Sequence, residues 1–331
     1  MNRRKFLYSA AYILIVMIIG VLVVEGGVRV YIACSPYHSD KAYFSSLFGW
    51  GCNSVIVGSE DAGSAKILVI GDSFTQRSDG KRYYDYLVES LPGTQLFEYG
   101  CGAYGWVQEY MVLDHYIDSL KPDLIIWQLC YNDIVNNDYA LESASFMHND
   151  SRTRPYYEEG RLIWRYPRRY FGWLNALLQS SLALRILQHN FDLIAIERAG
   201  GSIAQRLERH DPMIRNALRN SAAVMQMFKK RADSIPVVAF TAKTFLTSPY
   251  LHMPVWVEKE YASLCASNQI LYVDDIEARL LRAVAQGESI NLSWEKPASH
   301  WNEAGHRIVA EGLRVFLQKH GLAPHTKQTV E

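Results

Sequence analysis

Residues 67–76 read ILVIGDSFTQ, a short apolar run that ends abruptly in a glycine, an acid and a hydroxyl. Four apolar residues in succession are typical of a buried parallel strand, and Gly71-Asp72-Ser73 is typical of the turn at its carboxyl end. Ligands of open α/β sheets bind at that edge. The stretch therefore predicts an α/β fold and places Ser73 where a functional group is expected.

The same succession of strand and helix repeats along the chain. Alternating segments of this length favour a parallel sheet covered by helices on both faces. Strands are predicted at 67–70, 95–99, 124–129, 237–241 and 270–273, and helices near 74–90, 107–120, 212–232, 255–266 and 302–320.

An uncharged apolar stretch at residues 6–24 precedes this pattern. Its length suits a membrane helix, which needs about 20 apolar residues. Three basic residues lie just before it, so the positive-inside rule places the N-terminus in the cytoplasm and the rest of the chain in the periplasm or outside the cell. We expect an uncleaved single-pass anchor in the cell membrane. A cleaved signal peptide is the alternative, although no Ala-x-Ala site follows the run.

These segments predict an anchor at residues 1–34, a linker at 35–65, one α/β domain at 66–323 and a tail at 324–331. The linker is expected because residues 35–65 are rich in Ser, Gly, Pro and aromatic residues without periodicity. Within the domain, residues 139–210 interrupt the alternation for too long to be a plain loop, and we expect a lid or an accessory insert there.

The insert is rich in aromatic residues that suit either of two roles. They can stack on sugar rings or hold acyl chains, or they can pack against one another in an accessory helical layer. The candidates are Trp164, Tyr166, Tyr170 and Trp173.

Charge and cysteine content exclude several classes of protein. The chain has 34 acidic and 34 basic residues, so no basic field predicts nucleic acid as a partner. The five cysteines contain no Cys-x-x-Cys pair, so neither a zinc site nor a disulfide framework is predicted. Cys101 and Cys130 lie in apolar surroundings and are expected to pack in the core as small hydrophobes.

Polar groups that suit acyl chemistry follow three of the predicted strands. Ser73 follows the first strand and opens a helix, although a serine there is also a good N-cap. Gly100 follows the second strand and can point a backbone N–H at a ligand, and Asn132 follows the third with a side-chain amide. If the strands adjoin, these groups would form an oxyanion hole.

A histidine near the last helix would supply the missing base. His300 lies in the loop before that helix, from which it can return to the same edge of the sheet. Because Ser73, Gly100 and Asn132 are predicted at that edge, we expect His300 to act as a general base. His306 falls at the start of the helix, and we expect it to pack or cap.

Together these blocks resemble the SGNH (GDSL-type) hydrolase superfamily, whose name records Ser, Gly, Asn and His in that order. The matching residues are Ser73, Gly100, Asn132 and His300, within Gly-Asp-Ser, Gly-Cys-Gly-Ala-Tyr-Gly-Trp-Val-Gln, Tyr-Asn-Asp and His-Trp-Asn-Glu-Ala-Gly-His. The match covers residues 66–138 and 236–320 and leaves out the anchor and the insert.

The resemblance implies a flavodoxin-like three-layer α/β/α sandwich that cleaves or transfers acyl groups through a serine ester. Ser73 would attack the acyl carbonyl, His300 would move the proton, and Ser73 N–H, Gly100 N–H and Asn132 would hold the oxyanion. No metal or cofactor is expected. The expected partner is an ester substrate, a polysaccharide or a lipid, and the alternatives are an O-acyltransferase with the same site, or an impaired glycan-binding or scaffold protein.

One position departs from the family pattern. Family members usually carry an aspartate two or three residues before the histidine, where it orients the ring. This chain has Pro297 and Ala298 there. Three explanations stay open: Glu295 substitutes for the acid, a backbone carbonyl holds the ring of His300 in a Ser-His dyad, or the enzyme is impaired.

Overall fold

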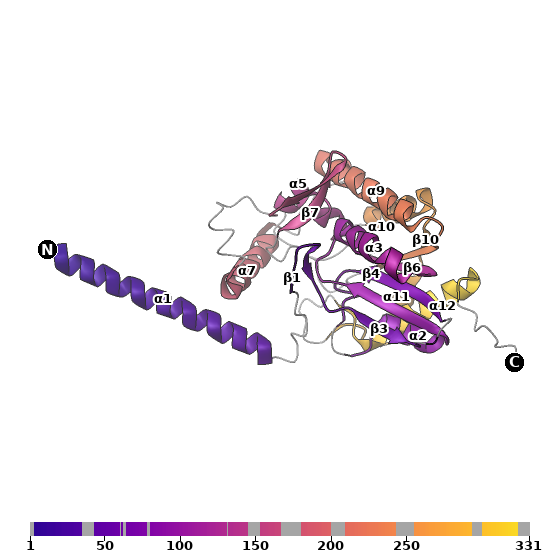
Figure 1. Cartoon of the computed structure of the whole chain (residues 1–331), viewed down its shortest axis with the longest axis horizontal. Coiled ribbons are helices and arrows are strands. Elements are labelled where there is room, and N and C mark those ends of the chain that lie inside the picture. The colour runs from indigo at the N-terminus through magenta and orange to yellow at the C-terminus, as the bar shows by residue number, and fades with distance from the viewer. Residues whose placement is uncertain are drawn as a thin grey trace.

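The computed structural model describes residues 3–34, 43–59, 61, 64–77, 80–130, 132–144, 153–166, 180–199, 209–242, 255–292 and 300–323. The predicted tail at 324–331 lies outside these ranges. Figure 1 shows a long N-terminal helix, α1 (Arg3–Cys34), beside a domain built on one central sheet.

The central sheet has six strands in the order β10-β9-β6-β4-β5-β3. Five of them are parallel, and β3 (Val55–Gly58) pairs antiparallel with β5 at one edge. In chain order the parallel strands run 2-1-3-4-5, which is the flavodoxin-like order, and proteins with this order bind ligands at the point between the first and third strands where the order reverses. The parallel strands are β4 (Ala65–Gly71), β5 (Thr94–Gly100), β6 (Leu124–Cys130), β9 (Val237–Ala242) and β10 (Leu271–Val273).

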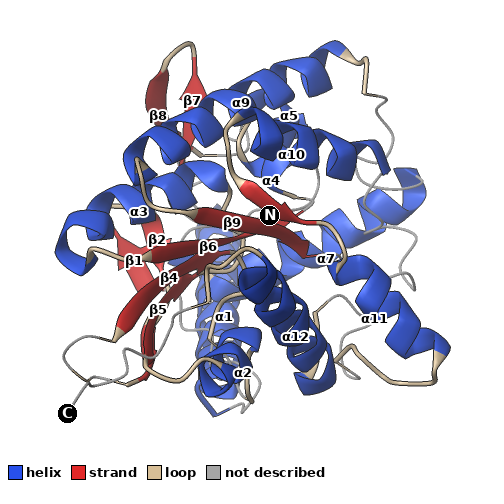
Figure 2. Cartoon of the chain, turned by 90° about the vertical axis from the view of Figure 1, so that its right-hand side faces the viewer, coloured by secondary structure: helices blue, strands red, loops and turns tan. Residues whose placement is uncertain are grey.

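Helices cover both faces of this sheet, as Figure 2 shows: α3, α9 and α10 lie on one side and α2 and α12 on the other. The central strands need both layers because every residue of β6 and the last five residues of β4 are buried. Fully burying one aliphatic side chain stabilises a fold by roughly 1.5–3 kcal/mol. The predicted three-layer sandwich is confirmed, with α2 (Tyr83–Ser90), α3 (Trp106–Leu120), α9 (Pro212–Ala232), α10 (Val255–Ser267) and α12 (Glu303–Lys319).

Several of the described helices differ from the expectation. The helix expected from residue 74 begins only at Tyr83, because residues 73–76 form a turn in which Gln76 N donates to Asp72 O. The short helices α4 (Asp133–Asn136) and α5 (Tyr139–Ala144) were not predicted, and neither was α11 (Ile276–Ala285), which packs beside α12. The short turn keeps Ser73 close to the end of β4.

The stretch expected to be a linker is partly built into the domain. Residues 43–58 form β1 (Tyr43–Ser45), β2 (Gly49–Gly51) and β3, and β3 is an edge strand of the main sheet. Its pairing partner lies about forty residues later in the chain, so no local pattern announces it.

A disulfide joins Cys52 to Cys101, which corrects the expectation that no disulfide forms and that Cys101 is a core thiol. Cys130 and Cys265 are free and buried, as expected for Cys130. Two further bonds strengthen the same link, since Trp50 Nε1 donates to Gly102 O at 3.1 Å and Tyr104 OH donates to Trp50 O at 2.6 Å. Trp50 of β2 and the following Cys52 therefore fix the glycine-rich loop at residues 100–105.

The insert contains the helix α5 (Tyr139–Ala144), a hairpin of β7 (Arg154–Glu158) and β8 (Arg161–Arg165), and the helix α7 (Leu182–Ala199). The buried Arg154 ties it to the glycine-rich loop, donating to Ala103 O and Gln108 Oε1, both at 2.7 Å. The same guanidinium pairs with the buried Glu142 at 3.0 Å. Trp164 is 44 % exposed, whereas Tyr170 and Trp173 lie outside the described residues.

The N-terminal helix is longer than the predicted apolar run at 6–24. Within it, Ala11–Tyr31 is long and apolar enough to cross a membrane, and no part of that stretch is buried in the protein. An exposed apolar helix at this position is consistent with a signal anchor or a signal peptide.

We expect the disulfide to stabilise the domain measurably, because it closes a loop of 49 residues and removes conformations from the unfolded chain. Replacing Cys52 with Ser should lower the free energy of unfolding by about 2–4 kcal/mol. Urea denaturation of the full chain in detergent measures this. Reduction should lower the free energy of unfolding of the wild type by a similar amount and should leave that of Cys52→Ser unchanged. Equal stability of the oxidised and reduced wild type would contradict the prediction.

Candidate active site

Ser73 lies at the carboxyl end of β4, in a turn held by its neighbour Asp72. The buried Asp72 accepts from Phe74 N through Oδ1 at 3.0 Å, and its own N–H donates to Gln128 Oε1 at 3.0 Å. Gln128 belongs to β6, so the turn is fixed to two adjoining strands. Ser73 itself is only partly buried, which leaves its hydroxyl accessible.

His300 meets Ser73 at this edge of the sheet, as predicted from their separate blocks. The distance from His300 Nε2 to Ser73 Oγ is 2.8 Å, which is hydrogen-bond distance. The imidazole lies against Phe74, with ring centroids 4.8 Å apart. A hydroxyl and an imidazole in this contact can act as nucleophile and general base.

The loop that carries His300 is held by its neighbours on both sides. Leu292 N donates to His300 O at 3.1 Å, and Asn291 and Trp301 form an isolated antiparallel bridge. Trp301 is fully buried and packs edge-on against Phe74 at 4.6 Å. The aromatic pair thus fixes both the serine turn and the histidine loop, a role that the sequence alone did not reveal.

His306 packs in the interior, as expected. It is buried, and its Nε2 lies 2.7 Å from Nη1 of Arg82. Burial, and then the positive charge of Arg82, lower the pKa of His306 well below its ordinary value. This ring is therefore neutral near pH 7 and supports the fold beneath His300.

The backbone N–H of Gly100 is engaged within the protein. It donates to Oε1 of the buried Glu98 at 2.5 Å, and a side chain at Gly100 would collide with Thr75 and Gln76. The use of Gly100 N–H as an oxyanion donor therefore requires Glu98 to release it. The close approach of the segments at Gly100 and at Thr75 and Gln76 explains why only glycine fits here.

A second glycine of the same loop lies close to the serine. A Cβ built on Gly102 would lie 3.7 Å from Ser73 Cβ, and Gly102 N donates to Gln76 Oε1 at 2.6 Å. Sequence reasoning missed Gly102, although the repeated glycines at 100–105 mark the whole loop. Nothing in the sequence indicated that the side-chain oxygen of Gln76 accepts the hydrogen bond from Gly102 N.

Asn132 follows β6 and is buried beside the same edge. Its Nδ2 donates to Asn136 Oδ1 at 2.7 Å, which uses one of its two N–H bonds. The strands that carry Ser73 and Asn132 are neighbours, as the oxyanion-hole prediction required. Glu295, Pro297 and Ala298 lie outside the described residues.

Three buried carboxyl groups lie at or near the serine turn, and one of them, Asp72, belongs to the turn itself. Burial raises the pKa of Asp72, Glu109 and Asp133, and mutual repulsion raises it further for Glu109 and Asp133. Each accepts hydrogen bonds: Trp127 Nε1 donates to Glu109, and Trp106 Nε1 and Cys130 N donate to Asp133. Among the described residues, no three His, Cys, Asp or Glu side chains are grouped to hold a metal ion.

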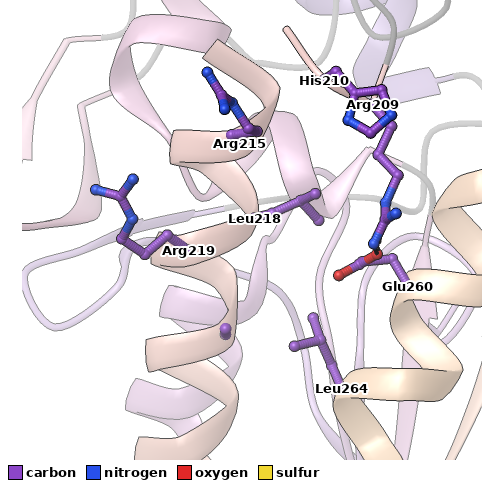
Figure 3. Close-up of a pocket in the computed structure, with 8 residues that line it drawn as sticks. Arg209, His210, Arg215, Leu218, Arg219, Glu260 and Leu264 are labelled. Carbon is purple, nitrogen blue, oxygen red and sulfur yellow. Dashed lines mark hydrogen bonds and ion pairs between the residues drawn. The ribbon is translucent and has the colours of Figure 1, made fainter. Parts of the chain in front are cut away.

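A separate cavity of about 480 Å³ lies between α9 and α10, as Figure 3 shows. Basic side chains dominate its lining, and Arg209 pairs with Glu260 at 2.6 Å. None of the candidate active-site residues lines it. The other lining residues are His210, Arg215, Leu218, Arg219, Ala222 and Leu264.

No protein-family model and no curated protein matches the sequence. Among solved structures, a member of the lipolytic protein G-D-S-L family from Veillonella parvula is 14% identical with a TM-score of 0.43, matching 77% of this chain and 99% of its own. Axe2, an acetylxylan esterase from Geobacillus stearothermophilus, is 15% identical with a TM-score of 0.43, over 80% and 95%. LAE5, an alpha/beta hydrolase from the Lake Arreo metagenome, is 15% identical with a TM-score of 0.44, over 80% and 99%.

The buried Glu98 should give stability a measurable pH dependence. Burial raises its pKa from 4.5 to about 8, so between these values the folded state binds a proton that the unfolded state lacks. This contribution makes stability fall as pH rises from about 4.5 to 8, by at most about 1.4 kcal/mol per pH unit for one group.

Glu98→Gln should remove that part of the decline, because glutamine still accepts from Gly100 N but does not titrate. Urea denaturation at several pH values between 5 and 8 measures, for the wild type and for the variant, the slope of the free energy of unfolding against pH. Parallel slopes for the wild type and the variant would show that Glu98 is already ionised in the folded protein.

Proposed function

We propose that this protein is a serine esterase that works through an acyl-enzyme on Ser73. The observation that carries the proposal is the 2.8 Å contact between Ser73 Oγ and His300 Nε2, at the sheet edge where the strand order reverses. Two residues more than two hundred positions apart meet there in the geometry of nucleophile and base.

In the first half-reaction, Ser73 Oγ bonds to the acyl carbon while His300 Nε2 takes the hydroxyl proton. The resulting tetrahedral intermediate then breaks its bond to the alkoxy oxygen, and His300 returns the proton to the departing alcohol. In the second half, water adds to the acyl-enzyme as His300 takes its proton. The intermediate releases the carboxylic acid when the proton returns to Ser73.

The oxyanion would lie among donors at the ends of the three neighbouring strands. Ser73 N–H, the second N–H of the Asn132 amide and an N–H of the glycine-rich loop would supply them. Gly100 or Gly102 would serve once its internal acceptor, Glu98 or Gln76, moves away. Removing one such donor from a serine protease costs about 10²–10³ in rate.

The proposed substrates are ester-linked acyl groups of a glycan or a lipid outside the cytoplasmic membrane. The exposed apolar α1 supports anchoring, with the N-terminus in the cytoplasm and the domain beyond the membrane. The Cys52–Cys101 disulfide independently favours an oxidising compartment. An O-acyltransferase would use the same acyl-enzyme with an acceptor alcohol in place of water.

Covalent labelling tests whether Ser73 is a nucleophile. The full chain should react with a fluorophosphonate probe, and Ser73→Ala should abolish the labelling because it removes the hydroxyl that lies 2.8 Å from His300 Nε2. Ser90→Ala, a change on α2 that leaves the site intact, is the matched control and should label fully. A folded wild-type sample that fails to label would favour the non-catalytic scaffold.

Substitution of Glu295 tests how the histidine is supported. If this carboxylate orients the His300 ring, Glu295→Gln should lower the turnover of an aryl acetate by up to about 10⁴-fold, as loss of the orienting acid does in serine proteases. Glu288→Gln, at an exposed glutamate before the same loop, should leave the rate unchanged. An unchanged rate in Glu295→Gln would remove Glu295 from the mechanism and favour a Ser-His dyad.

A further inference from the structure

The helix α7 of the insert begins against the N-terminal helix α1 (Figure 1). Glu25 of α1 accepts from Leu182 N and Ala183 N, both at 3.0 Å, and from Ser181 Oγ at 2.9 Å. The first N–H groups of a helix have no partner within the helix, and a carboxylate is favoured there by the helix dipole. One side chain therefore fixes the start of α7 to a defined level of α1.

A second contact strengthens this joint. Arg29, one turn further along α1, donates to Ser180 O at 3.0 Å and pairs with Glu25 at 2.7 Å. Glu25 and Arg29 thus bind both the N–H groups and a carbonyl of the segment that opens α7. The joint is a specific polar contact between two segments far apart in the sequence.

Glu25 is also the first charged residue after the apolar stretch at 6–24. At 1.5 Å per residue this stretch is about 28 Å long, close to the roughly 30 Å of the hydrocarbon core of a bilayer. If α1 crosses the membrane with the stretch at 6–24 in the hydrocarbon, Glu25 and the start of α7 therefore lie at the outer boundary of the hydrocarbon.

An exposed apolar stripe runs along α7 from this joint. Leu187 is 54 % exposed, Phe191 69 % and Ile194 45 %. Their spacing of four and three residues places them on one face of the helix, and the exposed Arg198 follows at the same spacing. Three large apolar side chains on one exposed face are typical of a surface that is covered in its working environment.

We propose that α7 lies on the outer surface of the membrane that α1 crosses, with Leu187, Phe191 and Ile194 inserted into the boundary between headgroups and acyl chains. This inference rests on the anchoring stated in the proposed function. Interfacial helices bury their apolar face about 5–10 Å into that boundary. Leu187 lies only about 8 Å along α7 from its first residue, so the stripe starts close to the level of Glu25.

We expect lipid to cover the stripe because the contact at Glu25 joins the start of α7 to the helix α1, which itself crosses the membrane in this proposal. Arg198, at the far end of the stripe, has a long side chain that can extend its charge to the headgroups. The contact would hold the domain at a fixed height. Ser73 would then act on esters presented near the bilayer surface.

Site-specific fluorescence in the full-length protein tests this placement. Single cysteines are introduced by Phe191→Cys, Val16→Cys and Val284→Cys in a Cys34→Ser background, and each is labelled with an environment-sensitive nitrobenzoxadiazole dye. The remaining free thiols at Cys130 and Cys265 are buried. The proteins are reconstituted into vesicles of phosphatidylethanolamine and phosphatidylglycerol, with and without lipids that carry a quenching doxyl group.

Val16 of α1 reports the anchor, and Val284 is the matched control, an exposed apolar residue on α11. We expect quenching at 191 by lipids labelled near the headgroup, quenching at 16 by lipids labelled deep in the chain, and none at 284. Quenching at 16 but not at 191 would overturn the α7 proposal and keep the anchor. Quenching at neither position would overturn both the membrane contact of α7 and the membrane span of α1. Quenching at 191 alone would support the membrane contact of α7 and overturn the span of α1.

A second variant separates the joint from the anchor. Glu25→Ala removes the acceptor at the start of α7 and leaves the apolar stretch of α1 unchanged. We expect it to reduce quenching at 191 while quenching at 16 persists. Equal quenching at 191 with and without Glu25 would show that α1 does not set the level of α7.

Discussion

The site depends on the turn that holds Ser73 at the end of β4. Asp72 forms this turn by accepting from Phe74 N, and its own N–H is tied to Gln128 on the next strand. The strand order reverses between these two strands, so the serine lies where open α/β sheets bind their ligands. Phe74 then packs against His300 and Trp301, which brings the base to the hydroxyl.

This arrangement requires polar groups in a region that the fold buries. Asp72, Glu109 and Asp133 lie beneath the site without solvent, and an isolated buried charge would cost several kcal/mol. Hydrogen bonds from tryptophan and backbone N–H groups lower this cost, and the raised pKa values favour the protonated, uncharged form of each carboxyl.

Local patterns predicted the parallel strands, the three layers and the meeting of Ser73 with His300, because strand ends share one edge of a sheet. They missed whatever depends on contacts between distant segments. The edge strand β3 and the Cys52–Cys101 bond join residues about forty to fifty positions apart, which periodicity does not reveal. The engagement of Gly100 by Glu98 and of Gly102 by Gln76 depends on side-chain positions, so the sequence showed a glycine-rich loop without its hydrogen bonds.

A double-mutant cycle on Ser73 and His300 measures whether the two residues act as one catalytic unit. We expect Ser73→Ala, His300→Ala and the double variant to lower kcat/KM for an aryl acetate by the same factor, about three orders of magnitude or more, since removing either partner disables the same step. Multiplicative losses, or full activity in His300→Ala, would show that the two residues do not work as nucleophile and base.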